Sequence, residues 1–162
     1  MHIQSSTVTV LHVTKSSPKP FDEVIAAFEE QLGAADIAAM LKSVEAGEPY
    51  TAIEKMEGSS GLMIFSSIDM SGVIPSVLKT KRKARQYLVG NPLIADKMIR
   101  HHIEVGLYVP LRVFIAETDD GTTFVFDKPT SFLGQWNNAE IDVVAKSLEE
   151  RLDNLTDKAL AL

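Results

Sequence analysis

The order of hydrophobic and polar residues changes period along the chain, and each period predicts a type of element. Residues 7–14 are rich in β-branched side chains that alternate between two faces, so they are expected to form a strand. From Phe21 to Leu32 the apolar residues recur with helical spacing and Gly33 follows, which indicates an amphipathic helix. The chain is therefore expected to begin with a strand and a helix.

A second amphipathic pattern lies between Asp36 and Gly47. The first of these residues can cap a helix at its start, and the second stands just beyond its last apolar position. The apolar stripe between them consists of Ile37, Met40, Leu41 and Val44. Residues 50–57 fit a short helix or a strand, because their apolar positions match helical spacing over only one turn, and we favour the helix. The sequence thus predicts an N-terminal strand and a helical pair within residues 7–47.

The middle of the chain carries two apolar segments that predict strands. Residues 62–69 begin as a nearly continuous apolar run, and residues 84–89 are interpreted as a second strand that enters Gly90. Asn91 can cap a following helix, and Pro92 suits its first position. This helix is expected to run to about His101.

The last third of the chain predicts a hairpin and a long helix. Residues 109–117 and 122–126 are rich in apolar side chains and enclose an Asp-Gly pair, which is a strong hairpin signal. Residues 138–156 then carry an amphipathic pattern that Asn137 or Asn138 can cap. The inner stripe of this helix comprises Ile141, Val144, Ala145, Leu148, Leu152 and Leu155.

The order of these elements favours one fold class. Strands and helices do not alternate regularly, which indicates an α+β fold, a two-layer α/β sandwich with helices on one face of a mostly antiparallel sheet. The chain has 162 residues, of which 45% are hydrophobic and 23% are charged, so it suits a single domain over residues 1–162. No internal repeat divides it.

Cysteine is absent, which excludes disulfides, thiolate nucleophiles and cysteine-ligated metal sites. Residues 1–6 lack the charged and apolar regions of a signal peptide, and no apolar run reaches about 18 residues. We therefore expect a cytoplasmic protein without a membrane span.

Charge is distributed unevenly along the chain. The net charge is −6, yet residues 79–112 carry eight Lys and Arg against two acidic residues. The acidic whole argues against a nucleic-acid-binding protein, whereas the local excess of +6 can attract one small anion or an acidic partner. Within this segment, the run Lys79–Arg85 lacks the interleaved aromatic residues of single-strand binders, so we interpret it as a solvated loop.

Three short motifs occur in a fixed order. They are Leu-Val-Gly-Asn-Pro at 88–92, Gly-Leu-Tyr-Val-Pro-Leu-Arg-Val at 106–113, and Asp-Gly at 120–121 followed by Phe-Asp-Lys-Pro at 126–129. The ordered set resembles the core of the domain-of-unknown-function family 302 over roughly residues 60–130. The resemblance implies a two-layer α/β fold that commonly pairs as a homodimer, and it implies no particular activity. Met70 departs from the pattern, since many relatives carry histidine there, which weakens any proposal built on a histidine after that strand.

Arginine side chains are the main candidates for ligand binding. Arg85 and Arg112 lie in predicted strands, where a guanidinium can point into a cleft and clamp a carboxylate or phosphate with two hydrogen bonds. Ion pairing with Asp69 or Glu117 is the alternative interpretation. Arg100 adds a third guanidinium from the basic segment.

Other polar residues complete the candidate sites. Asn91 can orient a ligand, although capping alone accounts for it. In the enzyme hypothesis, His101 is the candidate general acid or base, and Asp69 helps an arginine to organise the substrate. His101 and His102 diverge by about 100° on a helix, so they are poorly placed to chelate a metal together, and we predict no metal site. Both histidines more simply complement the C-terminal end of the helix dipole.

Two further residues have structural interpretations. His12 is expected to be packed or to lie at a sheet edge, and Asp127 is expected to be a turn residue before Lys-Pro. Neither a serine-nucleophile motif nor a phosphate-binding loop occurs, and no motif specifies a cofactor.

Three hypotheses of function follow. The first is a non-catalytic module that binds a small anionic ligand or a partner through Arg85, Arg100 and Arg112. The second is an enzyme that uses His101 on a carboxylate or phosphate substrate anchored by an arginine. The third is a structural homodimer without a ligand. The first two predict that the three arginines and His101 converge on one concave surface.

Overall fold

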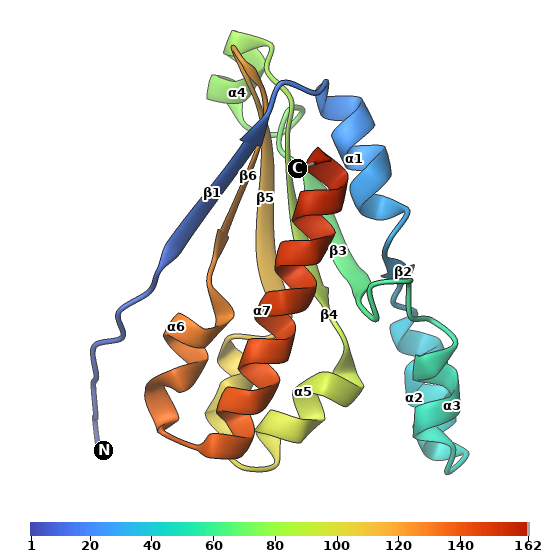
Figure 1. The fold of residues 1–162 in the computed structure, drawn as a ribbon. Coiled ribbons are helices and arrows are strands. Elements are labelled where there is room, and N and C mark those ends of the chain that lie inside the picture. Colours follow the sequence, from blue (N-terminus) through green and yellow to red (C-terminus); the bar gives the residue numbers. More distant parts are fainter. Residues whose placement is uncertain (162) are drawn as a thin grey trace.

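The computed structural model describes residues 1–161, which form one six-stranded sheet with helices around it (Figure 1). The strand order is β1-β6-β5-β4-β3-β2, and only β2 runs parallel to its neighbour. The α+β fold and the mostly antiparallel sheet expected from the sequence are confirmed. The strands are β1 (His12–Ser17), β2 (Gly33–Ala34), β3 (Met63–Asp69), β4 (Ala84–Gly90), β5 (Leu111–Thr118) and β6 (Gly121–Asp127).

The helices divide into two that cover one face of the sheet and several that lie around it. In Figure 1, α1 (Phe21–Glu29) and α7 (Ala139–Leu160) lie side by side on that face. The other helices lie at the ends and at the β2 edge of the sheet. They are α2 (Ile37–Glu45), α3 (Pro49–Glu54), α4 (Pro75–Thr80), α5 (Pro92–Ile99), α6 (Pro129–Leu133) and the 3-10 helices η1 (Ile103–Leu107) and η2 (Gly134–Trp136).

The main core lies between α1, α7 and the covered face of the sheet. Every second side chain of β5 and β6 is buried there, including Val113, Ile115 and Phe124. The ring of Phe28 lies 5.1 Å from that of Tyr87 and 5.3 Å from that of Phe124, measured between centroids. The predicted stripe of α7 is buried at Ile141, Ala145, Leu148, Leu152 and Leu155, while Val144 is partly buried.

The opposite face of the sheet is open. Alternate residues of β5 and β6 face this side, and Phe114 and Val125, which pair with each other, are half-buried there. Arg112 on the same face is exposed, and Ile68 of β3 is 47% exposed. The open face is therefore a mixed polar and apolar surface, as is common for antiparallel sheets with helices on one side.

The first strand lies further along the chain than its pattern predicts. β1 begins at His12 and not at residue 7, because β6 ends at Asp127 and the register pairs these two residues. At the other end, Ser17 pairs with Thr122, close to the hairpin turn. A strand persists only where a neighbour supplies hydrogen-bond partners, so the partner sets the limits of β1.

The second predicted helix forms as α2, but it packs mainly against α3 and not against the first predicted helix, and its apolar stripe is not covered. Asp36 caps α2, because its side chain accepts a hydrogen bond from the Ala39 N–H at 2.9 Å. α3 confirms the preference for a short helix. Of the predicted stripe only Met40 is buried, whereas the exposed fractions are 50% for Ile37, 60% for Leu41 and 57% for Val44. A second, small core of Met40, Ile53 and Met63 holds this pair.

Several short elements were not predicted. β2 has two residues, and α4 and α6 have six and five, which is too short for a periodic pattern. The run Lys79–Arg85, interpreted as a solvated loop, spans the end of α4, a left-handed Lys81 and the start of β4. α5 ends at Ile99, slightly before the expected end near His101.

Candidate functional site

Arg85 lies on the helix-covered side of the sheet and is engaged inside the protein. Its Nη1 lies 3.2 Å from Glu29 Oε1 and 3.5 Å from the Tyr87 hydroxyl. These contacts, first the hydroxyl and then the carboxylate, raise the pKa of Arg85 against the effect of burial. Ion pairing with Asp69 or Glu117 was the alternative expected from the sequence, but the carboxylate that pairs with Arg85 is Glu29.

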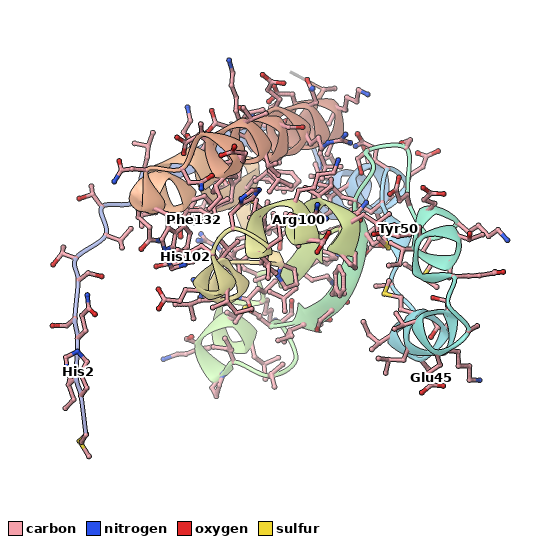
Figure 2. All side chains as sticks on the ribbon, turned by 90° about the horizontal axis from the view of Figure 1, so that it is seen from below. His2, Glu45, Tyr50, Arg100, His102 and Phe132 are labelled. Carbon is pink, nitrogen blue, oxygen red and sulfur yellow. The ribbon has the colours of Figure 1, made fainter. Side chains whose placement is uncertain are left out.

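Arg100 and His101 lie at the end of α5. Arg100 pairs with Asp96 one helical turn earlier, and the hydrogen bond to this carboxylate is the main cause of its raised pKa. Beside it, a shallow depression is lined by Lys97, Arg100, His101 and the first turns of α7. Figure 2 gives the position of Arg100 as seen from this end of the molecule. The neighbouring His102 faces Trp136, with ring centroids 5.1 Å apart.

Asn91 and Asp69 form hydrogen bonds to nearby backbone groups at opposite ends of β4. The Asn91 side chain accepts from the Leu93 N–H at 2.9 Å, and its amide donates to Glu57 at 2.6 Å and to the Gly61 carbonyl at 2.9 Å. Asp69 pairs in register with Arg85, and hydrogen bonds from Ser71 hold the pKa of its carboxyl below the usual value. Both side chains therefore have structural partners.

The candidates named from the sequence do not converge. Arg85 lies on the covered face and Arg100 with His101 at the end of α5, while Arg112 points from the open face. Asp69 ends β3 beside the first residues of β4, whereas His101 follows the helix after the last residue of β4. The expectation of one shared concave surface is therefore wrong, and Arg112 has to be considered separately.

Arg112 lies in a row of polar side chains that crosses three strands of the open face. His12 pairs in register with Asp127, and the pairing of Val113 with Phe126 places Arg112 opposite Asp127. His12 Nδ1 and Asp127 Oδ1 lie 3.1 Å apart. Among residues 1–161, Arg112 takes part in no ion pair or side-chain hydrogen bond, so its donors are available to a ligand.

A hollow of about 520 Å³ opens beside this row. Its polar end is formed by Arg112 and Asp127. Its apolar wall comes from four separate elements of the chain, because η1, α6, β4 and the segment before β1 meet at this end of the sheet. That wall includes Val10, Leu88, Leu107, Tyr108 and Phe132. The rings of Tyr108 and Phe132 are stacked, with centroids 5.3 Å apart and planes 20° apart. We call this site the Arg112 hollow.

Sequence reasoning found one of the three polar groups of the row. Arg112 was singled out, but His12 was interpreted as a packed or edge residue and Asp127 as a turn residue. The signal that was missed is the alternation of side chains along β1 and β6. It places His12 and Asp127 on the same face, but this can be recognised only once the limits of β1 are known. The tight β5-β6 hairpin, which sets the register of Arg112 against Asp127, was predicted correctly.

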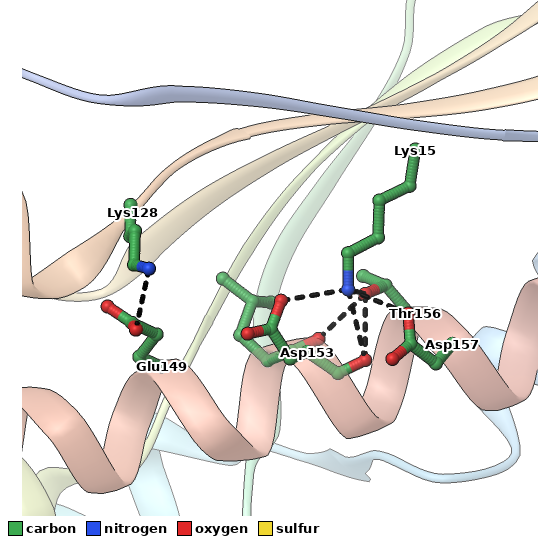
Figure 3. Close-up of polar contacts among 7 residues, drawn as sticks. Lys15, Lys128, Glu149, Asp153, Thr156 and Asp157 are labelled. Atoms are coloured by element: carbon green, nitrogen blue, oxygen red, sulfur yellow. Dashed lines mark hydrogen bonds and ion pairs between the residues drawn. The ribbon is translucent and has the colours of Figure 1, made fainter.

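A second polar cluster links β1 to α7, and its charged groups already have partners in the protein (Figure 3). Lys15 Nζ lies 2.8 Å from Asp153 Oδ1 and 2.7 Å from Asp157 Oδ1, and it donates to Thr156 at 3.1 Å. Nearby, Lys128 Nζ lies 3.0 Å from Glu149 Oε1. Each charged side chain of this cluster has a partner of opposite charge, which indicates a structural role.

The part of the chain that the structure describes contains neither a candidate metal site nor a candidate membrane-spanning helix. No three histidine, aspartate or glutamate side chains of residues 1–161 are grouped so that they could hold a metal ion. Over the same residues, no helix has the length and apolar character needed to cross a bilayer.

The fold defines an α+β protein with a mostly antiparallel sheet, and the comparisons identify the family. A family model described as "Domain of unknown function DUF302" matches residues 40–159, so this chain belongs to that family. The resemblance drawn from the motifs is confirmed, and it extends well beyond residues 60–130.

Solved structures with a similar fold include the crystal structure of the uncharacterized conserved protein DUF302 from Bacillus stearothermophilus. The TM-score is 0.64 at 18% sequence identity, with 91% of this chain and 97% of that chain covered. At this identity the likeness concerns the fold alone. No curated protein matches the sequence.

Proposed function

We propose that this protein binds a small anionic ligand with an apolar body in the Arg112 hollow. The observation that carries the proposal is an exposed guanidinium, without a protein partner among residues 1–161, at the rim of a hollow with a largely apolar wall. Such a combination of a few polar groups and an apolar wall is typical of small-molecule sites.

The charges of the row restrict the class of ligand. A guanidinium binds carboxylates and phosphates through two parallel hydrogen bonds. Asp127 stands opposite Arg112 and adds a negative charge at the same rim, so a ligand with a second anionic group is repelled. We therefore expect a monoanion, best a monocarboxylate, whose apolar body lies against Tyr108 and Phe132.

The test compares two arginine variants in calorimetric titrations with a panel of aromatic and aliphatic monocarboxylates. Arg112→Gln removes the charge and the paired donors, so affinity should fall by about 10- to 100-fold, as expected for a charged hydrogen bond worth about 1.5–3 kcal/mol. Arg100→Gln is the matched control and should leave affinity unchanged. Binding that survives in the first variant and disappears in the second would place the ligand in the depression beside His101 instead.

A further variant tests the role of the acidic group. Asp127→Asn removes the repelling charge, so dicarboxylates should gain affinity relative to monocarboxylates. Titrations of one dicarboxylate and its monocarboxylate analogue with both proteins measure this preference. An unchanged preference would show that Asp127 does not select the ligand.

A homodimer that pairs through the open face is the second candidate function. The observation in its favour is a row of paired residues across the open face, which α1 and α7 leave uncovered. In this row the exposed Ile68 and the half-buried Phe114 and Val125 are joined through Gln86. Sedimentation velocity should then give twice the chain mass of 17.8 kDa. Phe114→Lys should return the monomer, whereas Val143→Lys, on exposed α7 surface, should not. A wild type that sediments as a monomer at high concentration would exclude this candidate.

A further inference from the structure

A second cavity lies next to the Arg112 hollow and has a different chemical character. Its volume is about 190 Å³, and it lies between α5 and the chain that enters β5. The two cavities share Val109, Pro110 and Leu111, and they have no other lining residue in common. The rest of the second cavity is almost entirely apolar, with Phe65, Ile94, Met98, Ile99 and Leu148 among its walls. We call it the α5 cavity.

Polar partners are lacking inside the α5 cavity. Asn91 is the polar side chain of its lining, but its oxygen already accepts from Leu93 and its amide already donates to Glu57 and Gly61. Pro92 and Pro110 contribute no N–H groups. Water needs two to four polar partners to occupy a cavity well, so the α5 cavity disfavours water and favours an apolar guest.

Small residues keep the cavity open. Ala95 of α5 and Gly90 at the end of β4 both line it, and a Cβ built on Gly90 would lie 3.2 Å from Pro110 Cβ and 3.7 Å from the Phe65 ring. Larger side chains at these positions would occupy the space. The space is partly open to solvent, so its apolar walls are exposed to water unless a guest covers them.

We infer that the α5 cavity is a second binding site, for a small, uncharged and apolar ligand about the size of one aromatic ring or a short hydrocarbon chain. The size estimate comes from comparison with an engineered apolar cavity of about 150 Å³, which binds benzene. The inference is independent of ligand binding at Arg112, because the two sites share only the segment 109–111 of their linings and differ in the charge they accept.

The experiment uses toluene and indole as probes and follows both thermal unfolding and methyl NMR spectra. Saturable shifts are expected at the methyl groups of Ile94, Met98 and Leu148, together with a rise in melting temperature. Methyl groups of Val10 and Leu107 belong to the Arg112 hollow and should not shift. Toluene that shifts no methyl group of the α5 cavity in the wild type would overturn the inference.

Variants then locate the site. Ala95→Leu fills the cavity and should weaken toluene binding at least tenfold, whereas Ala26→Leu, a matched change on the exposed side of α1, should preserve it. Arg112→Gln should also preserve toluene binding, which separates this site from the proposed carboxylate site. Equal affinity of the Ala95→Leu and wild-type proteins would contradict the inference. The wild-type methyl shifts decide the question if Ala95→Leu does not fold.

Discussion

At the scale of single residues, Tyr87 illustrates how a polar group is held inside this core. Its side chain is fully buried, and its hydroxyl donates a hydrogen bond to Glu29 Oε1 at 2.6 Å. Burial is the main reason that the pKa of this hydroxyl is raised, and the adjacent carboxylate of Glu29 raises it further. The carboxylate also binds Arg85, so three side chains from α1 and β4 form one small network.

Replacing this tyrosine should cost stability through the lost hydrogen bond. Tyr87→Phe keeps the ring contacts with Phe28 but removes the donor to Glu29, so the free energy of unfolding should fall by about 1–3 kcal/mol. Tyr50→Phe is the matched control, since Tyr50 is 59% exposed, and it should change stability by less than about 0.5 kcal/mol. Urea unfolding at neutral pH measures both. Equal stability of the two variants would mean that the hydroxyl contributes nothing.

The raised pKa of Tyr87 also predicts a pH dependence. The unfolded tyrosine loses its proton near pH 10, while the folded one keeps it at that pH, so the folded state binds more protons. This contribution to stability is therefore complete below about pH 10 and is lost as the pH rises further. The difference in unfolding free energy between the wild type and Tyr87→Phe should shrink above that pH. A constant difference between about pH 8 and 11 would contradict the prediction.

At the scale of elements, the Lys15 cluster fastens an edge strand to the longest helix (Figure 3). The Lys15 side chain is only 17% exposed, while the two carboxylates it contacts are nearly half exposed. Burial lowers the pKa of Lys15, but hydrogen bonds to Asp153 and Asp157 outweigh this effect, so the pKa is raised overall. The two α7 carboxylates thus stabilise the charge of Lys15, and this contact is part of the packing of β1 against α7.

Removing this charge should loosen β1. Lys15→Met keeps the length of the side chain but leaves Asp153 and Asp157 without their partner, and we expect a loss of about 1–2 kcal/mol of unfolding free energy. Lys146→Met, an exposed α7 lysine without an ion pair among residues 1–161, is the control and should have little effect. Guanidinium unfolding would screen the ion pairs, so urea is the appropriate denaturant. Similar losses in both variants would show that the cluster is not specific.

Periodic and capped elements of this protein could be predicted from the sequence, whereas elements defined by a distant partner could not. α1, α7 and the β5-β6 hairpin follow from local patterns, and the caps Asp36 and Asn91 were named correctly. For α7, Asn137 and Asn138 were both candidates, and the cap is Asn138. The limits of β1 depend on β6. β2 depends on Gly33, because a Cβ at this position would lie 1.6 Å from the Met56 carbonyl oxygen.

The candidate site was predictable to a smaller extent, for the same reason. A guanidinium on a strand is visible in the sequence, so Arg112 was named. Whether it is free or paired depends on the neighbouring strands, and this separates Arg112 from Arg85, which has the same local pattern but meets Glu29 of α1. The apolar wall of the Arg112 hollow comes from four separate segments, which no local pattern brings together.

At the scale of the whole molecule, the α2-α3 pair is attached through a smaller core than the rest. In Figure 2, Glu45 and Tyr50 mark this pair at one side of the body, and the N-terminal segment with His2 extends from the other side. The stripe of α2 buries Met40 and leaves Ile37, Leu41 and Val44 largely exposed. Local opening of this pair should therefore require less free energy than opening of the sheet.

Amide hydrogen exchange should reveal this difference. Amides of α2 and α3 should exchange at least tenfold faster than those of β5, whose neighbours on both sides are paired. Met40→Ala should accelerate exchange in both helices and leave β5 unchanged, because it removes part of the small core. Leu41→Ala, at a 60% exposed position, is the control and should accelerate neither. Uniform exchange over the molecule would show that the two cores open together.

The position of β1 at the sheet edge also matters while the protein is being made. His12 and its partner Asp127 are 115 positions apart, and α7, which holds Lys15, is made later still. At about 5–20 residues per second, ribosomes need roughly 6–23 s to cover that separation. During this interval β1 has been synthesised but has no strand to join, and β6, once made, must capture a segment that emerged long before it. The growing chain therefore carries an unplaced strand for most of its translation, and completion of the sheet has to wait until nearly all of it has been produced.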